Sequence, residues 1–342
     1  MSPLFIGLFI VITAGLFQGS FAMPMSYARS WKFENSWMMF SLLGMVGLNL
    51  LVSLLTIPGL FAIIGAATFG ELAPAIFFGI LWGLGAITFG LGVSSVGLAL
   101  GYATVLGTVL GMGTFVPMVV LHPSEILSAK GILILLGLLV TFTGIGVSGA
   151  AGIRKEREQG KAAGEITRNA RFSMKMGILI CLISGICSSS INIGFSLSHP
   201  LIERALSMGA PENWAGNVIW VVLFISGGIL NIIYCSYLLI RNNSTKEYNN
   251  PGSWKNLGWM ALMSAFWIGS FIAYGAGSTM MGAWGTVIGW SVYMALSIAI
   301  ANFWGILQGE WVGASRKTRL LMIRGIGIII LAIVIFAYSG TI

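Results

Sequence analysis

Neutral polar and aromatic side chains are the residues of this sequence whose types could do chemistry, and they stand inside long apolar segments. The amides are Gln18, Asn192, Asn217, Asn231 and Asn302, and the aromatic residues are Trp82, Tyr102, Trp220, Tyr234, Trp267, Tyr274, Trp290 and Tyr293. An amide offers paired donors and acceptors to hydroxyl groups, and an aromatic face covers the C–H face of a sugar. This combination predicts a site for an uncharged, polyhydroxylated ligand.

Seven of these residues are the predicted substrate contacts: Trp82, Trp267, Gln18, Asn192, Tyr274, Asn217 and Trp290. Trp82 and Trp267 are favoured because each falls near the middle of its apolar segment. A lone amide in a membrane helix has an alternative role, a hydrogen bond to a neighbouring helix. Trp220 has an alternative place in the aromatic belt at the membrane interface.

Glu310 is the acidic residue closest to a plausible transport pathway. It stands in Leu-Gln-Gly-Glu-Trp, at the end of an apolar segment. Partial burial would raise its pKa and let it carry a coupling proton. The alternative is a helix-end carboxylate paired with Arg316 or Lys317.

Several chemistries have no support in the sequence. It contains no phosphate-binding Gly-x-x-x-x-Gly-Lys-Ser/Thr, no His-Glu-x-x-His and no cluster of metal ligands. His122 and His199 each precede a proline, which favours capping roles over a proton relay. Paired acids, bases or nucleophiles are missing from the apolar segments. We therefore expect neither an enzyme nor a bound cofactor or metal.

The elements that position these residues must lie in a membrane. Hydrophobic residues make up 57% of the 342 residues, charged residues 8%, and the mean hydropathy is +0.93. Glycine occurs 47 times, as expected where membrane helices pack closely. The first apolar segment lacks a basic start and a clear cleavage site, so it is expected to be a retained span. The three cysteines lie in apolar runs, which favours neither disulfides nor a metal site.

Ten apolar runs are long enough to cross a bilayer as helices, which need about 20 residues each. They cover roughly 4–26, 37–57, 73–94, 97–120, 130–150, 174–196, 214–240, 256–275, 284–307 and 320–340. They lack the alternating polarity of barrel strands. The fold class predicted is an all-α integral membrane protein with ten transmembrane helices.

Basic residues predict the orientation. Of the 18 lysines and arginines, all but Lys130 and Arg204 fall in or beside the loops that follow odd-numbered runs. By the positive-inside rule these loops are cytoplasmic, which places both termini outside, in the periplasm of a bacterial inner membrane. The net charge of +8 is thus a topology signal and not a nucleic-acid footprint.

A repeated string indicates how the ten runs are organised. Trp82, Phe89, Gly90, Gly92 and Gly97 reappear 185 residues later as Trp267, Tyr274, Gly275, Gly277 and Gly282, and a weaker match pairs Gly15 with Gly185 and Ser20 with Ser190. Five runs precede the polar insert and five follow, so the second copy enters the membrane from the opposite side. We expect repeats over 1–151 and 173–342, a charged cytoplasmic linker over 152–172, and a binding site near the midplane.

The sequence as a whole resembles the bacterial L-rhamnose–proton symporter family of the drug/metabolite transporter superfamily. The resemblance rests on Trp82-Gly-Leu-Gly with Phe89-Gly-Leu, on Leu135-Leu-Gly-Leu-Leu-Val before Gly144-Ile-Gly-Val, on Arg154-Lys-Glu-Arg, and on Gly309-Glu-Trp before Arg316-Lys317. It implies ten helices in two inverted repeats, an inner-membrane location and proton-driven uptake of a 6-deoxyhexose.

The function expected is therefore import of a monosaccharide, L-rhamnose or a related deoxyhexose, by proton symport with alternating access. The alternatives are an exporter of small neutral or amphipathic metabolites, a membrane subunit of an ATPase, and an integral enzyme. The expected partners are the sugar, the proton and the lipid bilayer, with no nucleic acid. The exact sugar, the coupling ion, the stoichiometry and the choice between monomer and homodimer stay open.

Overall fold

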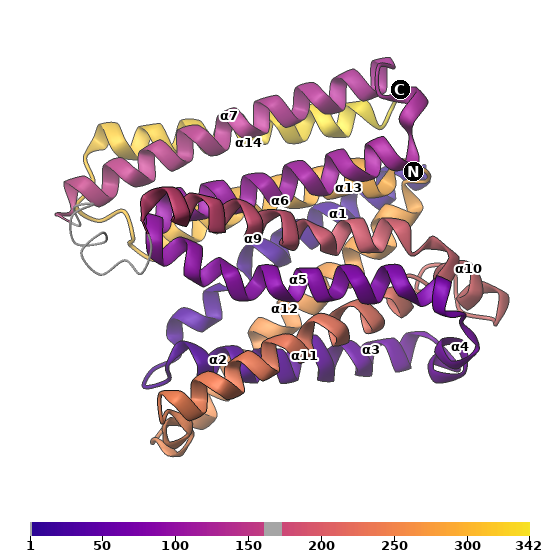
Figure 1. The fold of residues 1–342 in the computed structure, drawn as a ribbon. Coiled ribbons are helices and arrows are strands. Elements are labelled where there is room, and N and C mark those ends of the chain that lie inside the picture. The colour runs from indigo at the N-terminus through magenta and orange to yellow at the C-terminus, as the bar shows by residue number, and fades with distance from the viewer. Residues whose placement is uncertain (1, 161–172) are drawn as a thin grey trace.

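The computed structural model describes residues 2–160 and 173–342, which form helices joined by short connections, with no strand among them (Figure 1). Within these residues ten helical segments are long and apolar enough to cross a membrane. They are α1 (Pro3–Ser20) with η1 (Met23–Tyr27), α2 (Phe33–Phe40) with η2 (Ser41–Leu48) and α3 (Asn49–Thr56), α5 (Phe69–Val96), α6 (Leu98–Leu121), α7 (Ala129–Glu158), α9 (Met174–Leu197), α11 (Asn217–Arg241), α12 (Ser253–Met280), α13 (Gly285–Leu307) and α14 (Arg316–Ser339). The predicted all-α fold with ten spans is confirmed.

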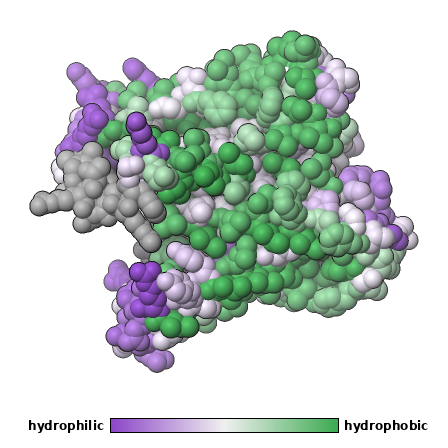
Figure 2. Space-filling model, in the orientation of Figure 1, coloured by the Kyte–Doolittle hydropathy of each residue, from purple (hydrophilic) through white to green (hydrophobic). Residues whose placement is uncertain are grey.

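The ten helices form one bundle with two polar ends. Figure 2 shows an apolar band across this side of the molecule, with hydrophilic residues gathered at the two ends. One end carries both termini (Figure 1), and we call it the terminal face. We call the opposite end the basic face, because loops rich in lysine and arginine lie there.

Three details differ from the predicted spans. α7 continues to Glu158, so the predicted linker begins inside a helix, and its part at 161–172 lies outside the described residues. Two short helices at the terminal face were not predicted, α4 (Leu60–Ala66) and α10 (His199–Ser207). The second span is interrupted by the π-helical segment η2.

Helices that correspond in the predicted repeat make similar contacts. α5 packs along α9, and their counterparts α12 and α1 pack in the same way. α6 contacts α9, as α13 contacts α1. α7 and α14, which are counterparts of one another, form a separate pair along one side of the bundle (Figure 1).

One pair of matched glycines, Gly92 and Gly277, has matched surroundings, whereas Gly90 and Gly275 do not. A Cβ at Gly92 would lie 2.7 Å from Cys181 Sγ, and a Cβ at Gly277 would lie 2.9 Å from a methyl group of Val11. Cys181 follows Val11 by 170 residues, which is also the spacing between Gly15 and Gly185. Because glycine alone permits these approaches, the repeated string encodes the packing of α5 on α9 and of α12 on α1.

The last glycine of each string lies after its helix and has a positive φ. Gly97 has φ = +91° between α5 and α6, and Gly282 has φ = +77° between α12 and α13. Residues with a Cβ avoid this region, so glycine allows the sharp turn that joins these helices. The inverted repeat itself stays a prediction.

Candidate functional site

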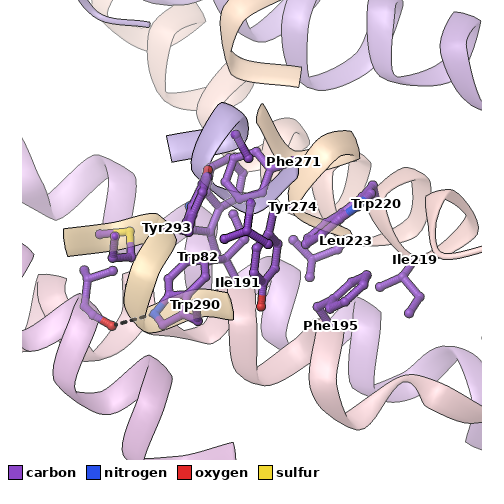
Figure 3. Packing of buried hydrophobic residues seen from close by; sticks show 14 of the residues in the cluster. Trp82, Ile191, Phe195, Ile219, Trp220, Leu223, Phe271, Tyr274, Trp290 and Tyr293 are labelled. Carbon is purple, nitrogen blue, oxygen red and sulfur yellow. Dashed lines mark hydrogen bonds between the residues drawn. The ribbon is translucent and has the colours of Figure 1, made fainter. Parts of the chain in front are cut away.

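Aromatic side chains fill the centre of the bundle (Figure 3). Trp82 of α5 stacks on Trp267 of α12, with ring centroids 5.7 Å apart and planes inclined by 24°. The two members of the duplicated pair thus meet each other at the centre. The rings around them are Phe40, Phe224, Phe271, Tyr274, Trp290 and Tyr293. Contact of Trp82 and Trp267 with substrate stays a prediction.

Gln18 takes part in a hydrogen-bonded chain beside this cluster. Ser270 Oγ donates to Gln18 Oε1 at 2.9 Å, and the same hydroxyl lies 3.1 Å from the Tyr293 hydroxyl. These contacts connect α1, α12 and α13 near the middle of the bundle. Gln18 is partly buried.

Asn192 lies at the centre of a second hydrogen-bonded group, together with Tyr274. Its Nδ2 donates to the Gly113 carbonyl at 2.8 Å and to the Thr286 carbonyl at 3.0 Å. The Tyr274 hydroxyl donates to Asn192 Oδ1, and the Tyr274 ring meets the Trp290 ring edge to face. The structure therefore brings three of the predicted ligand residues together, Asn192, Tyr274 and Trp290.

Asn217 and Asn231 connect helices, whereas Asn302 donates to the Ile298 carbonyl within α13. Asn217 Nδ2 donates to Thr56 Oγ1 at 2.9 Å, which links α11 to α3. Asn231 accepts a hydrogen bond from Trp37 Nε1 at 2.9 Å. Trp220 is fully buried and stacks between Phe195 and Phe224, so its interpretation as an interfacial belt residue is wrong.

A cavity of about 310 Å³ opens between α1, α6, α7 and α13 in the half of the bundle next to the basic face. Its volume lies at the lower limit of the range typical of small-ligand sites, roughly 300–1,000 Å³. Its polar and aromatic lining residues are Ser26, Tyr102, Ser148, Lys155, Glu156, Asn302, Trp304, Gln308, Glu310 and Trp311. We call it the basic-face cavity.

α1 stops early at one side of the basic-face cavity, which Gly19, Ala22 and Met23 line. Pro24 has no N–H to donate to the Ser20 carbonyl and cannot continue the helix, so α1 ends at Ser20 and a short 3₁₀ turn follows. In the other repeat the corresponding residue is Gly194, and α9 stays helical to Leu197. α1 and α9 therefore differ at corresponding positions: α1 stops before the basic face, whereas α9 stays helical toward the terminal face.

Two carboxylates line the basic-face cavity. Glu310 is half exposed, and its Oε2 lies 3.8 Å from Lys155 Nζ. Glu156 is partly buried and accepts a hydrogen bond from the Ala99 backbone N–H at 3.2 Å. Glu310 forms an ion pair, as the predicted alternative proposed, but its partner is Lys155 instead of Arg316 or Lys317.

Glu156 and Lys155 were not predicted from the sequence as members of a site. Their string, Arg154-Lys-Glu-Arg, has the composition of a solvated loop, but the extension of α7 turns two of its side chains toward the cavity. Tyr102 and Asn302 were recognised only as neutral polar residues within spans. A helical wheel continued beyond the apolar run would have placed Glu156 one turn after Gly152, which also lines the cavity.

His122 stands at the C-cap of α6 with its side chain against the segment before α13, whereas His199 is the first residue of α10. His122 stacks on Trp284 with centroids 3.9 Å apart, and its Nε2 lies 3.0 Å from the Ala283 carbonyl. His199 is exposed and faces Glu203. Within residues 2–160 and 173–342 no group of three potential ligand side chains could hold a metal ion.

Known proteins match this chain over nearly its whole length. Residues 2–340 match the family model of the L-rhamnose-proton symport protein (RhaT). An L-rhamnose-proton symporter of Salmonella gallinarum (strain 287/91) is 25% identical over 333 residues, which cover 95% of each chain, and one of Escherichia coli O17:K52:H18 has the same identity and coverage. One of Yersinia pestis (strain Pestoides F) is 25% identical over 319 residues, 91% of each chain. With ten membrane-spanning helices and a family match of this extent, the chain is a multi-pass inner-membrane transporter of the L-rhamnose-proton symport protein family.

Proposed function

We propose that this chain imports L-rhamnose, or a closely related deoxyhexose, together with protons by alternating access. The observation that supports the sugar most directly is the basic-face cavity, with amide and hydroxyl groups beside aromatic rings. Asn302 and Gln308 supply donors and acceptors for sugar hydroxyls, and Tyr102 and Trp304 supply faces for the C–H groups and the methyl group. The matched relatives are named for the same substrates.

The proposed direction follows from the basic residues. If the basic face is cytoplasmic, as the positive-inside rule requires, both termini lie in the periplasm and the cavity faces the cytoplasm. The structure then corresponds to the state that releases sugar into the cell. In the opposite state the central aromatic cluster, with Trp82 and Trp267 stacked in it, would form the floor of a periplasmic opening.

The proposed proton site is the carboxylate pair at the cytoplasmic cavity. Glu310 and Glu156 line the cavity together with Lys155, and Glu310 Oε2 lies 3.8 Å from Lys155 Nζ. A proton carried by either carboxylate would leave to the cytoplasm when the cavity faces it. Movement of α7 against the chain that follows α13 would separate Glu310 from Lys155, whereas Glu156 stays next to Lys155 on α7.

Uptake of labelled L-rhamnose tests the function. Cells that express the chain should accumulate the sugar against its gradient, and a protonophore should abolish accumulation while it leaves equilibration intact. Accumulation that survives the protonophore would refute proton coupling. Faster loss of preloaded sugar with no uptake would favour the exporter.

A panel of sugars identifies the cargo. L-Rhamnose, L-mannose, L-fucose and D-glucose should compete with the labelled sugar in the order of their likeness to rhamnose. Equal competition by D-glucose would show that the cavity does not recognise a deoxyhexose. An empty-vector strain supplies the background for both assays.

A further inference from the structure

We propose that a second sugar site lies at the terminal face between α6, α9 and α13, and that Asn192 both holds it closed and provides ligands when it opens. This inference rests on the proposed function for the identity of the ligand. We call the contacts of Asn192 with Gly113, Thr286 and Tyr274 the Asn192 bridge. The site is the counterpart, in the other repeat, of the basic-face cavity.

The correspondence between the two regions is fixed by close packing. A Cβ at Gly7 would contact Met280 and Met281, and one at Gly177 would contact Ser95 and Val96. These are the same positions in the two copies, so α1 and α9 are in register along their length.

The helices α6 and α13 are in register too. A Cβ at Gly15 would meet the Tyr293 carbonyl and Leu296, and one at Gly185 would meet the Val105 carbonyl and Thr108. In this register Thr286 corresponds to Leu98, Trp290 to Tyr102 and Gly113 to Ala301. Sequence spacing, continued beyond the end of α1 at Ser20, pairs Asn192 with Ala22 and Ser196 with Ser26. Every residue named second in these pairs lines the basic-face cavity.

The Asn192 bridge occupies the place where the other repeat is open. The Gly113 carbonyl is available because Pro117, four residues later on α6, has no N–H to donate to it. Asn192 supplies the missing donor and reaches across to the Thr286 carbonyl on α13. In the other copy Ala22 replaces Asn192 and Phe89 replaces Tyr274, so neither the amide nor the hydroxyl of the bridge is present.

Two orphaned hydroxyls support a ligand at this place. Ser196 Oγ and Thr286 Oγ1 are buried and have no hydrogen-bond partner within the described part of the chain. Ser196 follows Asn192 by one helical turn, on the same side of α9. Since buried polar groups are normally paired, two unpaired hydroxyls beside one bridge indicate groups that acquire partners in another state.

Opening of this face would expose a set of groups suited to a monosaccharide. Breaking the bridge frees the Asn192 amide, the Tyr274 hydroxyl and the Gly113 carbonyl, next to the Ser196 and Thr286 hydroxyls. Trp290, the counterpart of the cavity-lining Tyr102, provides an aromatic face. The sugar hydroxyls would replace the hydrogen bonds that Asn192 loses when the bridge breaks. Bound sugar therefore stabilises the open state.

Cysteine accessibility tests the site in whole cells. Ser196→Cys and Thr286→Cys are made separately in a chain whose Cys181, Cys187 and Cys235 are replaced by alanine and which still takes up rhamnose. A membrane-impermeant methanethiosulfonate reagent is added outside. Addition of Asn192→Ala, which copies the residue of the other repeat, should raise the labelling rate of both cysteines at least fivefold, and Asn231→Ala should leave it unchanged.

Sugar protection and a reciprocal variant complete the test. L-Rhamnose, but not D-glucose, should slow labelling at both positions. Ala22→Asn should lower labelling of Ser26→Cys in inside-out vesicles, because it brings an amide to the open repeat. If Asn192→Ala left labelling at both sites unchanged, or raised it no more than Asn231→Ala does, the bridge would not close this face.

The experiments distinguish failure of the proposed function from failure of the second sugar site. Absence of rhamnose uptake by the unmodified chain would refute the substrate, whereas the effect of Asn192→Ala on labelling without sugar reports on closure alone. Rhamnose uptake with unprotected cysteines would refute the site and leave the function intact.

Discussion

Glu310 and Glu156 share the basic-face cavity but differ in surroundings, which makes their roles separable by residue. Glu310 is half exposed beside Lys155, whereas Glu156 is partly buried and oriented by the Ala99 N–H. A carboxylate that carries the coupling proton is needed for accumulation but not for exchange of sugar across the membrane. This difference separates coupling from binding.

We expect Glu310→Gln to reduce proton-driven accumulation at least tenfold and to retain rhamnose counterflow. Glutamine keeps the size and polarity of the side chain but cannot release a proton. Glu156→Gln tests the second carboxylate in the same assay, and Glu212→Gln, an exposed residue of the α10–α11 connection, is the control. Undiminished accumulation in both cavity variants would exclude this pair as the coupling site.

The glycines of the repeated string also divide into two kinds. A Cβ at Gly277 would lie 2.7 Å from the Gly7 carbonyl oxygen and 3.1 Å from the Val11 nitrogen, whereas a Cβ at Gly90 would meet no atom within 4 Å. Gly277→Ala should therefore destabilise the protein by about 1–3 kcal/mol, the usual cost of overpacking.

Gly90→Ala is the matched control, since it makes the same change in the same string. The midpoint of thermal unfolding of the purified protein in detergent should fall for Gly277→Ala and stay within error for Gly90→Ala. Equal midpoints for the two variants would contradict the close approach of α12 to α1.

The sequence predicted the grouping of Asn192, Tyr274 and Trp290 only as residue types. It could not show that the Asn192 amide is saturated, because two of its partners are backbone carbonyls, which every residue has. Pro117, four residues after Gly113, is the one signal that a free carbonyl would stand there. Glu156 was missed for the opposite reason, because its charged neighbours resemble a loop.

At the scale of elements, hydropathy located the helices better than it located their ends. All ten predicted spans are present, because about 20 apolar residues in sequence have few other solutions in lipid. α7 outlasts its apolar run, since arginine, lysine and glutamate are good helix formers outside the bilayer. α4 and α10 were not predicted, because short helices at an interface do not need a long apolar run.

The early end of α1 makes a prediction about the cavity. Pro24→Ala restores a donor for the Ser20 carbonyl and lets α1 continue toward the basic face, as α9 continues in the other repeat. We expect the cavity to narrow and the initial rate of rhamnose uptake to fall at least threefold, without loss of thermal stability.

Pro123→Ala is the control for this change. Pro123 is the first residue of the 3₁₀ helix η3 (Pro123–Glu125), where a missing N–H costs no helical hydrogen bond. Uptake by this variant should match that of the unmodified chain. If Pro24→Ala also transported at the full rate, the bend after Ser20 would not be needed for the transport cycle.

At the scale of the whole molecule, the two repeats are interleaved. α5 of the first half packs on α9 of the second, and α12 of the second packs on α1 of the first. The longest pairing of α7 is with α14, where Gly137 lies against Phe336 and Gly144 against Ile329. Each half therefore lacks helices against which its own helices pack in the intact protein.

We expect neither half, expressed alone as residues 1–160 or 161–342, to bind or transport rhamnose. Co-expression of the two halves should restore uptake to a measurable fraction of the intact value, because the contacts between helices do not depend on the covalent link. Co-purification of a tagged first half with the second half measures the assembly. Transport by a single half would contradict the interleaved arrangement.

The Asn192 bridge has a consequence for how the carrier reads the sugar concentration outside the cell. Only molecules with a broken bridge can accept external sugar, so the apparent dissociation constant equals the intrinsic one divided by the fraction of such molecules. If one empty carrier in a hundred were open, the external affinity would appear roughly 100-fold weaker than the site itself. One amide, present in only one of the two repeats, would then set the half-saturating concentration for uptake and leave that for release unaltered.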